Sequence, residues 1–428
     1  MREKIVILGA GPAGLLLARL LLESEPNSDI HVFERADALQ DRENEKSFSF
    51  AIFKRGFDAL AQISGLDETV SRRCVLIEER MRNWMPPAVR RNKVKEPFRL
   101  CERNELIQCL LDSLEELNSE RFHIHFGAQC TDVDLQQKEV HFSMQGQNTI
   151  EAYDLLFGAD GAGSRLRQVL ERDADFACED KPYSRVYRNF YLDKNGRDQL
   201  SIGPNELHAW LLPGGLMVGA IPNPNGTATC NLVFAASNEE TTNAGHQWSM
   251  MEKSCPEVVA AVPEDERKAF LERKILQCRT IKLDRYHFEN HACLLGDAAH
   301  AVPPSVGQGC NSSLEDAVII ARLLKQFSGD RGKALEAYTA SRVPDMHALL
   351  RLSIYAMPLE PKLRKRYETK IRINEALRSV IPGLKPANLL DYLAGSVEPF
   401  SQTLKRYDGW IEKVESSNLA FIKEKQAG

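Results

Sequence analysis

The feature that most constrains the fold of this chain is a glycine-rich turn close to its N-terminus. A short apolar run, Lys4 to Leu8, leads directly into Gly-Ala-Gly-Pro-Ala-Gly at residues 9–14, and an apolar stretch with helical spacing follows. A second apolar run ends in Glu34, about 20 residues after the last glycine, where a carboxylate can bind an adenosine ribose. Strand, glycine turn, helix and acid together predict a dinucleotide-binding unit. Its expected contact residues are Gly9, Gly11, Ala13, Gly14, Glu34 and Arg35.

A second segment, residues 293–316, has the pattern of another ligand-binding turn. An apolar strand ends in Gly296 and Asp297, two prolines bend the chain, and Gly307-Gln308-Gly309 opens a long apolar helix. Backbone N–H groups at the start of a helix lack helical partners, and together with the helix dipole they favour negative charge. A reduced flavin carries negative charge on its N1 and C2 carbonyl side, so this turn suits the edge of a flavin ring.

The sequence GDAAHAVPPSVGQGCNSSLEDA, residues 296–317, resembles the corresponding segment of class A FAD-dependent aromatic monooxygenases. A third segment, GADGAGSRLR at residues 158–167, resembles the DG motif of that family and follows an apolar strand. The resemblance implies FAD contacts from Arg103, Asp160, Gly296, Asp297, Gly307, Gly309, Cys310 and Asn311. It also implies that Pro304 and Gln308 lie beside the reacting part of the flavin.

The resemblance implies a reaction as well. In this family NADPH or NADH docks transiently, reduces FAD and leaves, which agrees with the single GxGxxG unit of this chain. The reduced flavin adds O2 at C4a, and the resulting hydroperoxide transfers oxygen to an electron-rich aromatic ring. No acid–base side chain is obligatory for this step, because the protein mainly orients the ring and excludes water. We therefore expect hydroxylation of an aromatic substrate, with FAD and NADPH (or NADH) as cofactors.

Residues 185–234 contain short alternating strands separated by glycine-rich and Asn-Pro-Asn-Gly turns, which predicts an antiparallel sheet inserted after the DG motif. Parts of this stretch resemble kynurenine 3-monooxygenases, as do residues 46–51 and Arg80-Met81. The resemblance implies that Arg80 binds a substrate carboxylate, and Met217 and Phe234 are candidates for an apolar pocket. Each has an ordinary alternative, which is a surface charge for Arg80 and core packing for the other two.

Two departures from kynurenine 3-monooxygenases leave the substrate open. Residues 341–347 resemble the family's R-x-PDxHA stretch, but Ala356 replaces an Asn that helps to hold the amino-acid end of kynurenine, next to the candidate substrate residue Tyr355. Ser305-Val306 replaces a pair of aromatic residues. The alternatives are a kynurenine-like ring, a natural-product scaffold such as a quinolone or polyketide, and a flavin-binding redox sensor without hydroxylase activity.

Composition limits the partners more broadly. The net charge of −5 gives no general attraction to nucleic acid or to anionic membranes. The 10 cysteines show neither CxxC pairs nor metal-ligand spacing, so we expect reduced thiols in a cytoplasmic compartment and no metal. The apolar stretches are far shorter than the roughly 20 residues of a membrane span. We expect a small aromatic substrate and O2 as partners, no nucleic acid and no integral membrane segment, and the oligomeric state stays open.

These patterns predict the fold class α/β, with a Rossmann-like FAD-binding domain, an inserted antiparallel β-sheet substrate domain and C-terminal helices. Residues 1–180 are expected to form the first part of the FAD-binding domain, with residues 70–100 contributing to the substrate lobe. Residues 181–275 would form the substrate-binding sheet, residues 276–355 the second part of the FAD-binding domain, and residues 356–428 a C-terminal helical region with a basic run.

Overall fold

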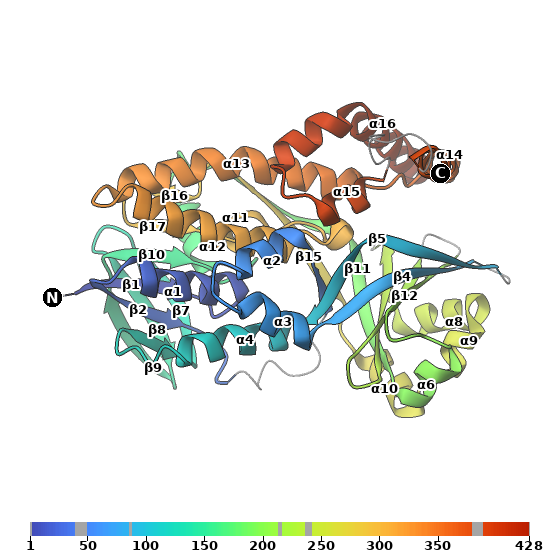
Figure 1. The fold of residues 1–428 in the computed structure, drawn as a ribbon, viewed down its shortest axis with the longest axis horizontal. Helices are drawn as coiled ribbons and strands as arrows, with labels where there is room; N and C mark the ends of the chain where they lie inside the picture. Colours follow the sequence, from blue (N-terminus) through green and yellow to red (C-terminus); the bar gives the residue numbers. More distant parts are fainter. Residues whose placement is uncertain are drawn as a thin grey trace.

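The computed structural model describes residues 2–38, 49–84, 88–212, 216–235, 242–378 and 388–427. These residues form two large β-sheets and one small sheet, with helices packed around them (Figure 1). The six-stranded sheet has the order β16-β17-β10-β1-β2-β6, and the eight-stranded sheet has the order β15-β11-β14-β13-β12-β4-β5-β3. This α/β architecture is the fold class expected from the sequence.

The six-stranded sheet is parallel except for its last pair, β16 and β17. Its strands are β1 (Glu3–Leu8), β2 (Ser28–Phe33), β6 (Phe122–His125), β10 (Leu155–Gly158), β16 (His287–Phe288) and β17 (Ala292–Leu294). Parallel strands are buried on both faces and therefore read as continuous apolar runs. Ile5 to Leu8 accordingly are at most 1% exposed. Helix α1 (Pro12–Ser24) packs against α4 (Arg103–Glu115) and α12 (Gly309–Gln326).

The eight-stranded sheet is antiparallel at every pair except β12 and β4, which are parallel. Its strands are β3 (Ser49–Ile52), β4 (Val75–Trp84), β5 (Ala88–Glu102), β11 (Cys178–Leu192), β12 (Glu206–Leu211), β13 (Met217–Pro222), β14 (Ala228–Ala235) and β15 (Leu276–Leu283). The strands of the inserted segment, β11 to β14, pair antiparallel as the sequence predicted. The parallel pair joins this segment to β4, which is far away in the chain, so no tight turn fixes their relative direction.

The two faces of the eight-stranded sheet carry different layers. One face packs against α6 (Lys194–Gln199), α8 (Ala244–Ser254), α9 (Pro256–Ala260) and α10 (Glu264–Glu272), which lie on the right in Figure 1. The other face carries a smaller apolar cluster, made of Phe53, Ile77, Val94, Phe98, Leu100 and Ala394. Strand β15 belongs to this sheet, although its residues fall within the segment expected to be the second part of the FAD-binding domain.

Short elements connect the sheets. The three-stranded antiparallel sheet consists of β7 (Ala128–Asp134), β8 (Glu139–Met144) and β9 (Gln147–Ala152). The short helices are α2 (Lys54–Leu60), α3 (Leu66–Arg73), α5 (Arg165–Leu170), α11 (Asp297–His300) and the 3-10 helix η2 (Pro304–Val306). Helices α5 and α11 each follow a strand of the six-stranded sheet, so their first residues meet at the carboxyl edge of that sheet.

Four helices complete the fold, α13 (Arg331–Tyr355), α14 (Pro361–Arg378), α15 (Leu389–Gly395) and α16 (Phe400–Ala427). Helices α13 and α16 pack together along the top of the molecule in Figure 1, and α15 lies beneath them, towards β5. Among the described residues, no helix combines the length and the apolarity that crossing a membrane requires. Within the same residues, His, Cys, Asp and Glu side chains form no group suited to a metal ion.

Candidate functional site

The glycine turn between β1 and α1 is shaped by close contacts on two sides. Gly9 has φ +99°, and a Cβ there would lie 2.5 Å from the carbonyl oxygen of Ala159. A Cβ on Gly14 would lie 2.2 Å from the Gly9 carbonyl oxygen. Gly11 differs, because the nearest atom to its Cβ position is 4.0 Å away, and no described side chain caps the helix that it opens. The backbone N–H groups at this helix start are therefore available to a phosphate.

Glu34 at the end of β2 holds the same turn. Its side chain is 6% exposed. The Oε2 atom accepts a hydrogen bond from the Ala10 N–H at 2.9 Å, and Oε1 accepts one from the Ala36 N–H at 3.1 Å. The next predicted contact residue, Arg35, is exposed. Glu34 thus positions the backbone of the glycine turn in addition to any contact that it makes with a ribose.

Three predicted cofactor residues differ in exposure but share desolvated surroundings. The side chains of Asp160 and Cys310 are half-buried and that of Asp297 is exposed. Nevertheless, desolvation by the surrounding protein raises the pKa of both carboxyls above the usual range, and it raises the pKa of the Cys310 thiol to about 12. Each of these groups is therefore packed among protein atoms, although none of the three residues is fully buried. No described residue donates to Asp160 Oδ1, although its Oδ2 accepts from the Arg165 N–H at 2.7 Å.

Arg103 and the start of α12 lie near Asp297 and Cys310. The guanidinium of Arg103, at the start of α4, lies close enough to oppose the desolvation shifts of Asp297 and Cys310, lowering both pKa values. Gly296 and Gly307 adopt the left-handed φ values +61° and +68° that favour glycine. No described side chain caps α12, which begins at Gly309. Arginine and an uncapped helix start both favour an anionic ligand.

Asn311 has a structural role that the sequence did not indicate. Its Oδ1 accepts from the Phe53 N–H at 2.8 Å, and its Nδ2 donates to the carbonyl oxygens of Ala51 and Gly307, each at 2.9 Å. The side chain is 1% exposed. Asn311 therefore connects β3 and α2 to the start of α12, and only its backbone N–H remains for a cofactor.

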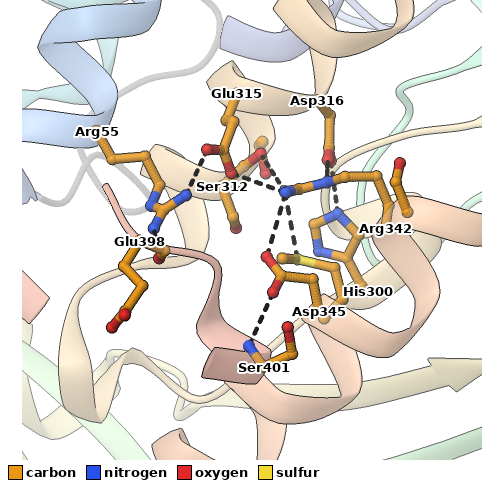
Figure 2. A network of polar contacts seen from close by, with 12 residues as sticks. Arg55, His300, Ser312, Glu315, Asp316, Arg342, Asp345, Glu398 and Ser401 are labelled. Atoms are coloured by element: carbon orange, nitrogen blue, oxygen red, sulfur yellow. Dashed lines mark hydrogen bonds and ion pairs between the residues drawn. The ribbon is translucent and has the colours of Figure 1, made fainter. Parts of the chain in front are cut away.

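A buried network of charges lies behind the α11 and α12 turns (Figure 2). Arg342 of α13 is 3% exposed, and its guanidinium contacts Asp316 at 2.7 Å and Glu315 at 2.8 Å. Asp316 Oδ2 also accepts from the Gly296 N–H at 2.9 Å and contacts His300 Nε2 at 2.5 Å. Burial alone would raise the pKa of Asp316, but the charges of His300 and Arg342 lower it to about 2.

The network extends to the C-terminal segment. Arg55 of α2 pairs with Glu315, donates to the Glu398 carbonyl oxygen at 2.6 Å and lies 4.1 Å from the centre of the Phe400 ring. Asp345 accepts from the Ser401 N–H at 2.8 Å. Sequence reading identified the segment around Arg342 by resemblance but did not find its partners. Acidic residues on an apolar helix, at positions 315 and 316, were the available signal.

The two predicted pocket residues of the eight-stranded sheet lie on opposite faces. Phe234 is 2% exposed and packs with Trp248 and Phe270 against the helical layer. Met217 pairs across the sheet with Val233, the neighbour of Phe234, so its side chain points to the other face. Phe234 thus packs as a core residue, which was the alternative for it, and the pocket role of Met217 stays a prediction.

Arg80 and Tyr355 contact different C-terminal helices. Arg80 lies on the sheet face away from the helical layer, and its Nη1 is 3.5 Å from Asp391 Oδ1 of α15. Tyr355 is hydrogen-bonded to Glu415 of α16; burial, followed by the charge of Glu415 and this bond, raises the pKa of its phenol. The two residues thus have different partners, and their shared role at a substrate stays a prediction. Helix α15, which the sequence did not identify, instead reaches Arg80.

Gln308 and Pro304 lie at the start of α12. Gln308 is fully buried, and its Nε2 donates to the Leu393 carbonyl oxygen of α15 at 2.8 Å. Pro304 is exposed. Residues 46–48 of the segment that resembles kynurenine 3-monooxygenases lie outside the described residues.

The fold and the site define a flavoprotein of the class A monooxygenase type. The chain belongs to the protein family described as "FAD binding domain", and the match to the family model spans residues 2–353. The uncapped helix starts and the open position at Gly11 fit FAD. By its curated relatives the chain is an FAD-dependent monooxygenase.

Two relatives show the extent of the similarity. The chain is 30% identical over 364 residues to kynurenine 3-monooxygenase of Stenotrophomonas maltophilia, covering 82% of this chain and 78% of the relative. It is 27% identical over 418 residues to kynurenine 3-monooxygenase of Flavobacterium psychrophilum, covering 94% and 90%.

Solved structures share the fold. A tetrameric form of 2-methyl-3-hydroxypyridine-5-carboxylic acid oxygenase has a TM-score of 0.69 and 18% identity, with 91% of this chain and 95% of that chain covered. CtdE in complex with FAD and a substrate has a TM-score of 0.66 and 14% identity, with 97% and 100% covered.

Proposed function

We propose that this chain uses NADPH or NADH to hydroxylate a small aromatic substrate with a kynurenine-like ring. The convergence of the three sequence motifs carries the proposal. A Cβ on Gly9 would lie 2.5 Å from the Ala159 carbonyl oxygen, beside Asp160. A Cβ on Gly296 would lie 3.5 Å from the Ala13 Cβ. The turn for a pyrophosphate, the DG motif and the α11 turn thus lie against one another, which supports a single flavin site.

In this proposal the residues of the chain hold and orient the reactants. Bound FAD, reduced by NADPH or NADH, supplies oxygen from O2 for transfer to the ring, by the C4a route that the sequence resemblance implies. The backbone of residues 307–311 would hold the pyrimidine edge, and Asp297 would bond the ribityl chain. Pro304 and Gln308 would border the reacting end, where Gln308 fixes α15 as a wall that excludes water.

The function is tested with the purified protein. We expect a flavin absorption spectrum, NADPH or NADH oxidation that is stimulated by an aromatic substrate, and a product with one oxygen atom derived from ¹⁸O2. L-kynurenine is the first compound to assay, followed by other anilines and phenols. A flavin-containing protein that never transfers labelled oxygen to any of them would refute the proposal.

A natural-product scaffold is the second candidate. Ala356 is 2% exposed and Tyr355 is bonded to Glu415, so neither offers the polar contacts that an amino-acid end would need. A larger ring system without an amino-acid end would not require those contacts. Stimulation of NADPH oxidation by quinolones or polyketides but not by L-kynurenine would favour this candidate. A flavin-binding redox sensor, in contrast, would oxidise NADPH slowly with every compound.

A further inference from the structure

The predicted substrate side of the site contains an ion pair that the sequence did not reveal. Arg80 of β4 lies over the Phe98 ring, with its guanidinium carbon 5.3 Å from the ring centre. Its Nη1 is 3.5 Å from Oδ1 of Asp391, in the first turn of α15. The two side chains are 22% and 14% exposed, so the pair is largely withdrawn from water but still reachable.

Helix α15 places this pair near the flavin end of the site. The Leu393 carbonyl oxygen, two residues after Asp391, accepts the hydrogen bond from Gln308 at the start of α12. The next residue, Ala394, packs with Phe98 in the apolar cluster. Each residue adds about 1.5 Å along a helix, so Asp391 and Leu393 lie within one turn. The ion pair and the predicted flavin edge therefore border the same region.

The face of the sheet is consistent with this position. Arg80 pairs with Leu207 of β12, and Leu207 and Ile221 both pack against the apolar cluster that contains Phe98. Met217 is four residues from Ile221 on β13 and so shares its face. The described residues named here are apolar apart from the Arg80–Asp391 pair. Two further acids lie beside α15. Glu398 is bonded to Arg406 at 2.8 Å, and Glu96 of β5 lies against Gly395, where a Cβ would be 3.3 Å from Glu96 Oε2.

We propose that the Arg80–Asp391 pair selects aromatic substrates whose polar end carries no net charge. The proposal rests on the hydroxylase function proposed above. A monoanion at Arg80 competes with Asp391 for the guanidinium and brings a second negative charge close to that carboxylate, and a monocation at Asp391 brings a second positive charge close to Arg80. Like charges side by side in a partly buried site repel each other, and a charge displaced from its partner there is poorly solvated. An uncharged end leaves the pair intact, and a zwitterionic end supplies an opposite charge to each partner.

Three compounds that share an ortho-amino aryl carbonyl unit separate the charge types. 2-Aminoacetophenone has an uncharged end, anthranilate an anionic end and kynuramine a cationic end. We expect the FAD-loaded protein to bind the uncharged compound at least about tenfold more tightly than either charged one. Binding is measured by titration calorimetry, which requires no turnover.

Two variants should change the preference in opposite directions. Asp391→Asn should tighten anthranilate binding by about tenfold, and Arg80→Gln should tighten kynuramine binding by a similar factor, each with little effect on 2-aminoacetophenone. The double variant should lose both gains. Asp408→Asn is the matched control, because it removes an acid from a pair with Arg351, at 3.1 Å, between the outer helices.

The outcomes separate this proposal from the proposed function. If the wild-type protein prefers anthranilate, or if the anthranilate preference of Asp391→Asn equals that of the wild type, the charge-selection proposal is wrong. The proposal is also wrong if Asp408→Asn tightens anthranilate binding as much as Asp391→Asn does. If affinities shift as expected but no compound acquires oxygen from ¹⁸O2, charge selection stands and the hydroxylase function fails. Bound FAD per chain, measured for each variant, confirms that the fold is retained.

Discussion

Gly9, Gly11 and Gly14 occupy one turn but have different surroundings. At Gly9 and Gly14 a side chain would collide with backbone carbonyl oxygens, at 2.5 Å and 2.2 Å, whereas at Gly11 the nearest atom to the Cβ position is 4.0 Å away. Gly9 and Gly14 are therefore required by the fold itself, and Gly11 is required only by a ligand that approaches the backbone. Sequence alone gives all three the same weight, because it shows spacing and not the neighbouring atoms.

This difference predicts two kinds of defect. Gly14→Ala should destabilise the protein by roughly 1–3 kcal/mol, since the contact is with backbone and cannot relax easily. Gly11→Ala should leave the melting temperature of the FAD-free protein unchanged but reduce the FAD bound per chain. Thermal unfolding of the FAD-free protein and the ratio of flavin to protein absorbance measure the two effects. An equal loss of stability in both variants would contradict the assignment.

Asp316 predicts a loss of stability in acid. Its folded pKa of about 2 is lower than the unfolded value of 3.8, so its contribution is complete above pH 4 and disappears as the pH falls from about 4 to 2. The shift corresponds to something on the order of 2 kcal/mol. Urea midpoints between pH 5 and pH 3 should fall less steeply in Asp316→Asn than in the wild type. Asp58→Asn, at an exposed site on α2, is the control for the loss of a carboxylate and should keep the wild-type slope.

The same substitution should also be costly at neutral pH. Asp316→Asn removes the negative charge between Arg342 and His300 in a fully buried position. Breaking a buried ion pair from one side typically costs about 3–5 kcal/mol. Denaturant unfolding at pH 7 measures the loss. A change below about 1 kcal/mol would show that the network contributes little to stability.

The helices, strands and turns whose sequence pattern lies within a short segment could be predicted from the sequence. The strand, turn and helix at residues 4–24 are set by neighbouring residues, and so is the turn at residues 296–309. Two features were not predictable. The parallel pairing of β4 with β12 joins segments from different parts of the chain, and α15 is a seven-residue helix whose role depends on partners in β4 and α12. Long-range pairing of this kind leaves no local pattern.

The histidines of strands β2 and β6 predict a second loss of stability in acid. His31 stacks on His123 and contacts His125 Nε2 at 3.2 Å, near Lys4 and Glu151. Burial, together with the neighbouring positive groups, lowers the pKa of His31 to about 4, and burial also lowers that of His125. A lowered histidine pKa favours the folded state above the unfolded value of 6.5, and this contribution is lost as the pH falls towards 4.

The melting temperature should therefore decrease between pH 7 and pH 5. His31→Gln should reduce this decrease, because it removes the most strongly shifted imidazole of the pair of strands. The measurement is thermal unfolding at both pH values for both proteins. A decrease of the same size in the variant would assign the acid sensitivity to other groups.

At the scale of the whole molecule, the buried charges connect parts that are distant in sequence. Arg55, Glu315 and Arg342 come from three helices, and Glu398 and Ser401 add the C-terminal segment (Figure 2). The sequence resemblance covered the chain up to residue 355 and gave no role to the rest. In the structure that remainder supplies α15, whose Leu393 accepts from Gln308.

Removal of this remainder should therefore affect the site. A chain that ends at residue 387 lacks α15 and α16, so we expect weaker FAD binding and, with substrate, more H2O2 per NADPH oxidised, because water reaches the reacting region. A chain that ends at residue 421 keeps the buried residues Ile411, Val414 and Asn418 and is the control. Peroxide and hydroxylated product are quantified together. Equal peroxide yields from the shortened and full-length chains would exclude a water-excluding role for α15.

The six-stranded sheet is completed by β17, at residues 292–294, between β10 and β16. During synthesis on a ribosome, β1, β2 and β10 emerge long before this strand, and Arg342 follows later still. The nascent chain must consequently remain without its flavin until most of its length has been translated, with an unpaired strand edge exposed in the meantime. The order of the strands thus makes cofactor capture a late event in biogenesis, and it makes the partly synthesised chain a candidate client for chaperones.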